Sequence, residues 1–290
     1  MTIAILRAEL RHGDCSGALL AMALLLGACS NPGSTAKDSP ATEVLSQTRI
    51  AEIVASPDRR EADRRNDLRR KPEQMLAFIG VRPGMVVLDL SAGGGYTAEL
   101  LARAVGPAGR VYGQSAARDP SRVAPKPAAP EGGSVLSAAP RPTSPQSLAE
   151  RAKNPAAGNI FAVVQRFEQP VPAEFASNGL DLVTLMFNYH DLGHMNVDRD
   201  QMNRAVFAAL KPGGLYVIAD HSGRPGTGIS ESGTLHRIEE AFLRKEVEAA
   251  GFGLADEGRF LRNPSDPRDR NLPGPPQPKD EFVLKFVKPR

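Results

Sequence analysis

Short apolar runs alternate along this chain with longer segments in which apolar positions recur at helical spacing. Four- to eight-residue apolar runs, most of them rich in valine, isoleucine and leucine, predict strands that are buried on both faces of a sheet. These runs cover residues 85–90, 110–114, 160–164, 180–187, 215–219, 252–255 and 281–287. Helical spacing or capping patterns predict helices over residues 72–79, 96–105, 144–152, 198–210 and 235–250. The alternation predicts an α/β fold with a doubly wound, mostly parallel sheet.

A glycine-rich turn follows the first predicted strand. Residues 89–95 read DLSAGGG, and the helix at residues 96–105 begins directly after them. Gly93, Gly94 and Gly95 allow positive φ angles and let a ligand approach the main chain closely. The helix start would direct unpaired N–H groups at that ligand, and Asp89 would order the turn or accept hydrogen bonds from the ligand. The alternative is a tight turn that holds no ligand.

The turn resembles the first motif of the class I S-adenosylmethionine-dependent methyltransferases, a strand ending in an acid followed by Gly-x-Gly-x-Gly. Here Ser91 replaces the first glycine. Residues 55–290 also resemble a group of predicted exported methyltransferase-like proteins with RKP, AGGGY, NYHD and LKPGG segments. These segments are residues 70–72, 92–96, 188–191 and 210–214. The resemblance implies a Rossmann-like fold of seven strands, the last antiparallel beside the fifth, with S-adenosylmethionine as cofactor.

The resemblance and the ends of the strands nominate the residues that bind the cofactor. They are Asp89, Ser91, Gly93, Gly94, Gly95, Tyr96, Gln114 and Asn188. In nucleotide-binding α/β folds, an acid at the end of the second strand binds the ribose hydroxyls. This chain has Gln114 or Ser115 there, and the nearest acid is Asp119. A glutamine hydrogen-bonds less strongly than a carboxylate, which lowers the expected affinity.

Catalytic candidates follow the fourth and fifth strands: Tyr189, His190, Asp191 and His221. These strands should be neighbours, so His190 and His221 should lie close together, with Asp191 and Asp220 beside them. We expect His190 to act as general base with Asp191 orienting it, while Tyr189 or Asn188 lines the pocket. The alternative is that His190 and Asp191 only cap the fourth strand and hold the next loop.

A metal site is a further alternative in the same segment. His190, Asp191, His194 and His221 are ligand types that zinc accepts. No helical two-histidine motif with a paired acid is evident, and the spacing from His190 to His194 crosses Gly193. We therefore predict no metal site from the sequence.

Two polar segments lie outside these elements. Residues 58–70 mix acids and bases at three- and four-residue spacing, which predicts a solvated helix with ion pairs. A basic lid over an anionic group or a lipid surface is the alternative. Residues 116–157 are rich in proline, alanine and serine and predict a long, poorly ordered loop with one short helix at residues 144–152.

The N-terminus has the pattern of a lipoprotein signal peptide. Residues 18–26 form an apolar run of the length of a signal-peptide core, and a small-residue segment then ends at Cys29. We expect residues 1–28 to be removed, Cys29 to carry lipid, residues 29–48 to form a flexible tether and residues 49–290 to form the domain. An ordinary signal peptide with an incidental cysteine is the alternative. Because Cys15 would be removed, no disulfide is expected. Ser30 in place of aspartate favours the periplasmic side of the outer membrane.

Composition sets limits on function. The chain has 290 residues, of which 41% are hydrophobic and 24% charged, enough for one sizeable core. The net charge of +3 gives no reason to expect a nucleic-acid partner. We expect an S-adenosylmethionine-dependent methyltransferase that acts on an unidentified small molecule. The alternative is a non-catalytic, ligand-binding envelope lipoprotein with the same fold, because a cytosolic cofactor is not expected in the periplasm. The oligomeric state stays open.

Overall fold

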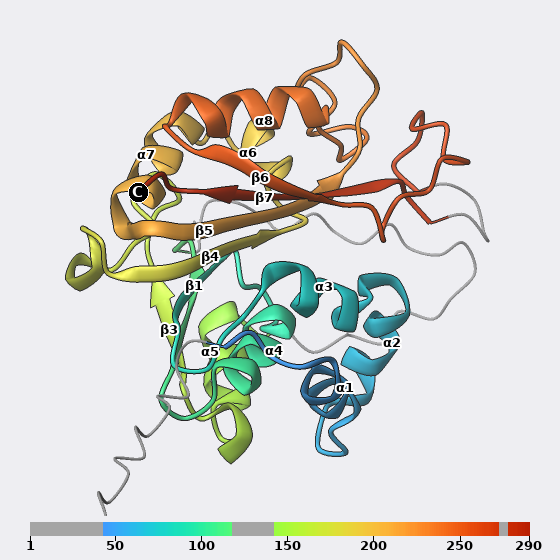
Figure 1. The fold of residues 1–290 in the computed structure, drawn as a ribbon. Helices are drawn as coiled ribbons and strands as arrows, with labels where there is room; N and C mark the ends of the chain where they lie inside the picture. The colour runs from blue at the N-terminus through green and yellow to red at the C-terminus, as the bar shows by residue number, and fades with distance from the viewer. Residues whose placement is uncertain (1–42, 118–141, 273–277) are drawn as a thin grey trace, which may run out of the picture. The chain divides into compact units, whose positions relative to one another are not determined.

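A seven-stranded sheet forms the centre of the structure, a computed structural model that describes residues 43–117, 142–272 and 278–290 (Figure 1). The strands are β1 (Val86–Leu90), β2 (Arg110–Ser115), β3 (Ile160–Val164), β4 (Leu180–Met186), β5 (Leu210–His221), β6 (Gly253–Gly258) and β7 (Glu281–Val287). Their order across the sheet is β3-β2-β1-β4-β5-β7-β6. Strands β1 to β5 pair in parallel, and β7 lies antiparallel between β5 and β6. The predicted fold class and the antiparallel last strand are confirmed.

Helices cover both faces of this sheet. They are α1 (Gln47–Ala55), α2 (Glu61–Arg70), α3 (Pro72–Ile79), α4 (Tyr96–Val105), α5 (Ser144–Arg151), α6 (Asp191–His194), α7 (Arg199–Ala209) and α8 (Glu240–Ala249), with 3-10 turns η1 (Pro155–Ala157) and η2 (Ala173–Phe175). In Figure 1, α1 to α5 lie on one side of the sheet and α6 to α8 on the other.

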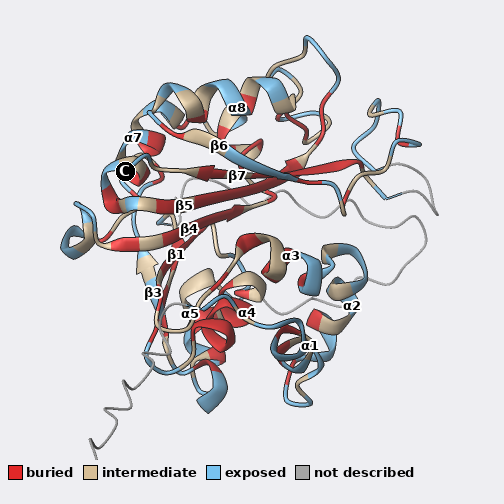
Figure 2. Cartoon of the chain, viewed as in Figure 1, coloured by how far each residue is buried: buried red, intermediate tan, exposed pale blue. Residues whose placement is uncertain are grey.

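Alternate residues of the central strands pack into two separate hydrophobic cores. Val87 lies in the core shared with α1, α3 and α4, and its neighbour Leu88 lies in the core shared with α7 and α8. Both side chains are fully buried, as is most of the central sheet in Figure 2. Because both faces are covered, the first strand reads as a continuous apolar run rather than an alternating one.

Two boundaries differ most from the sequence prediction. The helix predicted over residues 235–250 begins only at Glu240, because the backbone of Ile238 bonds to His221 and Gly223 beside the end of β5. Residues 211–214, predicted as a turn, lie inside β5, where the pairing with β4 shifts register between Leu180 and Leu182.

The charged segment 58–70 contains the predicted helix with ion pairs, α2, but this helix is not solvated on all sides. Helix α2 buries the carboxylate of Asp63, which pairs with Arg151 of α5 through two hydrogen bonds of 2.6 and 2.9 Å. Arg151 also pairs with Glu99 of α4. The alternating charges therefore connect three helices, and only part of them faces solvent.

Part of the Pro/Ala-rich segment is ordered helix. The predicted short helix at residues 144–152 is confirmed as α5, which a capping box between Thr143 and Gln146 starts. Of the remaining residues predicted as poorly ordered loop, Pro155–Ala157 form the 3-10 turn η1. Residues 118–141 lie outside the described part of the chain.

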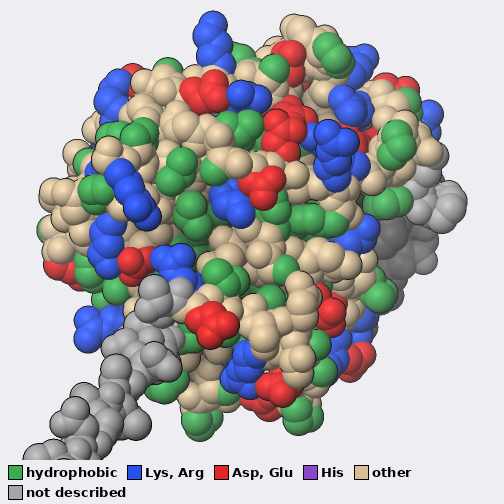
Figure 3. All heavy atoms as spheres, viewed as in Figure 1, with side chains coloured by type: hydrophobic (Ala, Val, Ile, Leu, Met, Phe, Trp, Pro, Cys, Tyr) green, Lys and Arg blue, Asp and Glu red, His purple; other side chains and the backbone are tan. Residues whose placement is uncertain are grey.

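The signal peptide, Cys29 and most of the predicted tether also lie outside the described residues, which begin at residue 43. Within the described ranges, no helix combines the length and apolar character needed to cross a bilayer. On the face drawn in Figure 3, basic and acidic side chains are interspersed.

Candidate active site at the carboxyl ends of the central strands

The glycine turn joins β1 to α4 through left-handed backbone conformations. Ser91, Gly93 and Gly95 have φ angles of 53°, 53° and 79°. A serine in this region is strained by about 1 kcal/mol relative to glycine. Two hydrogen bonds hold Ser91 there: its N–H donates to Gln114 Oε1 (3.0 Å) and its hydroxyl donates to Asn188 Oδ1 (2.5 Å).

The glycines of this turn serve different purposes. A Cβ on Gly95 would lie 2.8 Å from Arg151 and 2.9 Å from Leu148, so this glycine allows α5 to pack closely. A Cβ on Gly94 would meet nothing within 4 Å, and both Gly93 and Gly94 are exposed. No side chain caps α4, whose first N–H groups open beside this exposed backbone. The exposed part of the turn therefore suits an incoming ligand.

Asp89 supports the turn from below. It is buried, and its Oδ1 accepts a hydrogen bond from Thr184 Oγ1 of β4 (2.7 Å), while Oδ2 has no protein partner in the described residues. Burial raises the pKa of Asp89 to about 7.

Gln114 supports the turn, and both polar atoms of its side-chain amide bond to protein groups. Its side chain is fully buried, its Oε1 accepts from Ser91, and its Nε2 donates to the carbonyl of Gln165 (2.7 Å). The next residue, Ser115, has a buried hydroxyl without a partner among the described residues. Ser115 borders a depression of about 370 Å³ at the ends of β2 and β3, also lined by Thr143 and Val164. Ser115 is therefore the residue at the end of β2 that borders this depression.

His190 is held between two carboxylates. Its Nδ1 lies 2.6 Å from Asp220 Oδ1, and its Nε2 lies 3.1 Å from Asp191 Oδ1. Burial alone would lower the pKa of His190, but Asp220 and Asp191 outweigh it and raise the pKa to about 9. Asp191 in turn has a pKa of about 2, because His190 and His236 outweigh its burial. With both ring nitrogens engaged, His190 is an imidazolium at neutral pH rather than a free base.

Asp191 gathers further groups at the end of β4. Its Oδ2 accepts from Asn188 Nδ2 (2.7 Å), which links it through Asn188 to Ser91 in the glycine turn. Its Oδ1 lies 2.8 Å from His236 Nδ1. His194, by contrast, lies with its Nδ1 3.8 Å from that oxygen and 3.0 Å from Ser232 Oγ.

His221 lies beside His190, with ring centroids 5.3 Å apart, so the expected meeting of the two histidines is confirmed. Burial lowers the pKa of His221 to about 2, which leaves the ring neutral. Its Nδ1 is 3.0 Å from Glu281 Oε1, without hydrogen-bond alignment. Lys279 lies nearby, and burial lowers its pKa to about 8.

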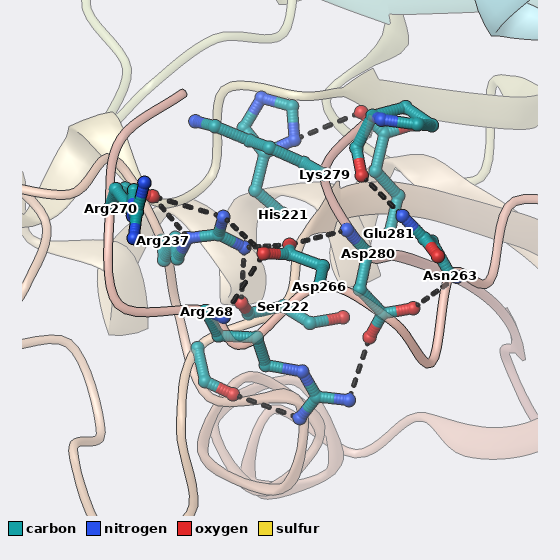
Figure 4. Close-up of polar contacts among 12 residues, drawn as sticks. His221, Ser222, Arg237, Asn263, Asp266, Arg268, Arg270, Lys279, Asp280 and Glu281 are labelled. Carbon is teal, nitrogen blue, oxygen red and sulfur yellow. Dashed lines mark hydrogen bonds and ion pairs between the residues drawn. The ribbon is translucent and has the colours of Figure 1, made fainter. Parts of the chain in front are cut away.

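A buried polar cluster stands behind His221 (Figure 4). The fully buried Arg237 pairs with Asp266 (2.8 Å) and donates to the carbonyls of Ser222 and Arg270. Asp280 accepts from Arg268 (2.7 Å). The cluster ties the segment before β7 to the segment after β5 and so fixes the wall that carries His221.

Tyr189 was expected to line the pocket, and this expectation is wrong. Its side chain is fully buried, and its hydroxyl bonds to Glu246 of α8 (2.9 Å) and Asn203 of α7 (2.8 Å). Tyr189 therefore packs under the helices, whereas its neighbours Asn188 and His190 contact Asp191.

Arg70, at the end of α2, is a site residue that sequence reasoning missed. Its guanidinium lies 3.7 Å from the ring centroid of Phe187 and forms no hydrogen bond or ion pair with the described residues. It lines a small apolar cavity together with Tyr96 and Met186. The hydroxyl of Tyr96 is already bound to Asp67 (2.7 Å), so only its ring faces this cavity. Burial lowers the pKa of Arg70 to about 10, and it stays charged at neutral pH.

Comparison with solved structures identifies the fold. A SAM-dependent methyltransferase from Aquifex aeolicus matches with a TM-score of 0.51 and 16% identity over 84% of this chain and 99% of its own. A proposed sarcosine dimethylglycine methyltransferase from Galdieria sulphuraria matches with a TM-score of 0.54 and 16% identity over 84% and 98%. A proposed methyltransferase of Haloferax volcanii, in complex with the Trm112 activator, matches with a TM-score of 0.51 and 16% identity over 85% and 100%.

These likenesses and the strand order establish that the chain has the class I methyltransferase fold. No protein-family model matches the sequence, and no curated protein is similar to it in sequence.

Proposed function

We propose that the protein is an S-adenosylmethionine-dependent methyltransferase that acts on an unidentified small molecule. The observation that carries the proposal is the turn from β1 to α4, where exposed Gly93 and Gly94 precede an uncapped helix of 10 residues. In this fold that turn lies at the carboxyl end of a central strand, where open α/β sheets bind ligands. The solved neighbours named as methyltransferases support the same reading.

The polar groups suggest how the cofactor would lie. Its methionine part would pass the glycine turn, with Arg70 as partner for the carboxylate and the helix start beside it. Its adenosine would extend toward Ser115 and the depression at the ends of β2 and β3. A serine hydroxyl there is a weaker partner for the ribose than a carboxylate by about 1 kcal/mol, or roughly fivefold in Kd.

The acceptor would enter between the ends of β4 and β5. Methyl transfer requires the acceptor atom, the methyl group and the leaving sulfur to be aligned, so positioning carries most of the catalysis. Asp191, Asn188 and His221 would line the acceptor side. Because both nitrogens of His190 are engaged, we assign it to positioning Asp191 rather than to the general-base role.

Turnover tests the proposal. The purified protein would be incubated with methyl-labelled S-adenosylmethionine and small-molecule fractions of the source cells, beside a Gly94→Leu variant. We expect S-adenosylhomocysteine and a labelled small molecule to form with the wild type and not with the variant. A folded wild type that binds the cofactor but labels no fraction would favour the non-catalytic alternative.

We also propose that Cys29 carries lipid and anchors the exported protein to the cell envelope. The small-residue segment before Cys29 supports this. Cys29→Ser is expected to release the protein from the membrane fraction and to abolish incorporation of a labelled fatty acid. Unchanged fractionation and labelling would contradict the anchor.

A further inference from the structure

Two imidazole nitrogens converge on one carboxylate oxygen at the end of β4. His190 Nε2 lies 3.1 Å from Asp191 Oδ1, and His236 Nδ1 lies 2.8 Å from the same atom. All three donor atoms lie within 4.8 Å of one another. His190 and Asp191 are adjacent in the sequence, whereas His236 comes from the segment between β5 and α8.

The surrounding residues fix the orientation of these donors. Asp220, fully buried, bonds His190 Nδ1 (2.6 Å) and also accepts from the backbone N–H of His190 (2.8 Å). This leaves His190 Nε2 directed at Asp191. Asn188 holds the other oxygen of Asp191, so Oδ1 is the one that faces the histidines. A histidine whose second nitrogen bonds a carboxylate is the usual support of a metal ligand.

His236 is held in place at some cost in backbone strain. Its φ is 50°, in the left-handed region that a non-glycine residue rarely adopts. Its side chain is partly exposed, and its one hydrogen bond to a described side chain goes to Asp191. Residues held in such strained conformations cluster at ligand and active sites.

We propose that His190 Nε2, Asp191 Oδ1 and His236 Nδ1 bind a divalent transition-metal ion such as zinc, which would replace the proton on His190 Nε2 and release it to solvent. Ligand atoms at 2.0–2.2 Å from a tetrahedral ion lie about 3.3–3.6 Å apart, so the separations of 3.1 and 2.8 Å found here would have to widen by less than about 1 Å to admit the ion. Two histidines and one carboxylate are also the ligand set of open catalytic sites. His194 is not part of the set, because Ser232 holds its Nδ1.

Such an ion would occupy the acceptor side of the site. Three protein ligands leave at least one coordination position for water or for an oxygen, sulfur or nitrogen atom of an acceptor. An acceptor bound there would lose its proton to solvent more readily. The metal site itself does not depend on methyl transfer, and its test needs no cofactor.

Zinc binding tests the proposal directly. Chelator-stripped, full-length protein would be titrated with Zn²⁺ in competition with a chromophoric chelator, beside His236→Gln and the matched control His194→Gln. We expect one zinc per chain in the wild type, at least about tenfold weaker binding in H236Q and unchanged binding in H194Q. Asp220→Asn changes the carboxylate that bonds His190 Nδ1 and the backbone N–H groups of His190 and His221, and it should weaken binding by roughly 10- to 100-fold.

A second measurement uses only the wild type, so it tests the proposal even if a variant fails to fold. Co²⁺ added to the wild type should give the intense visible absorption of a four- or five-coordinate ion with nitrogen ligands. A spectrum identical to that of aqueous cobalt would overturn the proposal. Equal loss of zinc in H194Q and H236Q would overturn it as well, because it would indicate loose binding by exposed histidines.

Discussion

Individual side chains in this protein carry out tasks that the related sequence motif assigns to other residue types. Ser91 stands at a glycine position, and Gln114 precedes the expected acid position. Together they replace a bare turn with a hydrogen-bonded one: Gln114 accepts from Ser91, and Ser91 donates to Asn188. Ser91 and Gln114, the two residues that differ from the methyltransferase motif, therefore help to hold the turn in place.

Gln114→Ala should destabilise the protein by about 2–4 kcal/mol, because it removes hydrogen bonds to the N–H of Ser91 and the carbonyl of Gln165 and leaves a cavity where the fully buried Gln114 side chain was. Urea unfolding followed by circular dichroism would measure this. The matched control Gln74→Ala, at an exposed position of α3, should stay within about 0.5 kcal/mol. A loss in Q114A no larger than in Q74A would show that Gln114 does not brace the turn.

Arg70→Met should weaken binding of S-adenosylhomocysteine about 10- to 100-fold, because a charge-assisted hydrogen bond to a carboxylate contributes roughly 1.5–3 kcal/mol. It should leave 5′-methylthioadenosine binding unchanged, since that ligand lacks the carboxylate. Arg65→Met, an exposed position on the same helix, is the control. Equal weakening of both ligands in R70M would place Arg70 elsewhere than at the carboxylate.

Among the elements, the strands could be predicted more accurately than the connections between them. β3 and β7 have the predicted bounds, because both are apolar runs limited by polar or turn residues. The start of α8 could not be predicted, since residues 235–239 have a helical pattern that backbone bonds to the end of β5 override. His236 lies in that stretch, and this is why the sequence did not place it in the site.

The segments after β5 and before β7 are joined by the buried pair of Arg237 and Asp266 (Figure 4). Arg237→Met should cost about 3–5 kcal/mol, because it leaves the Asp266 carboxylate buried and uncompensated. Thermal or urea unfolding would measure the loss, with Arg244→Met on the exposed side of α8 as control. If R237M were as stable as R244M, the Arg237–Asp266 pair would not contribute to the stability of the fold.

At the scale of the whole molecule, the sequence predicted the sheet and the meeting of His190 with His221, because chain order and the parallel arrangement determine which strand ends are neighbours. It could not predict the partners that come from distant segments. Arg70 of α2, Glu281 of β7 and His236 reach the site only through tertiary packing. The orientation of Tyr189 could not be predicted either, because the sequence does not show to which side of the sheet a residue after a strand points until the helices are placed.

The central claim is that the exposed glycine turn binds S-adenosylmethionine. Gly94 is the most suitable position to test, since a Cβ there would have no protein atom within 4 Å and its φ is not in the left-handed region. Gly94→Leu should therefore fold and still fill the ligand's path. Gly253→Leu, equally open and on the far strand β6, is the matched control.

Isothermal titration calorimetry of the purified protein with S-adenosylmethionine and S-adenosylhomocysteine is the most direct measurement. We predict one-to-one binding in the wild type and in G253L. In a folded G94L, the affinity should be at least about tenfold lower, or roughly 1.4 kcal/mol. No binding by the folded wild type, or equal binding by G94L, would contradict the claim and leave the fold with another ligand.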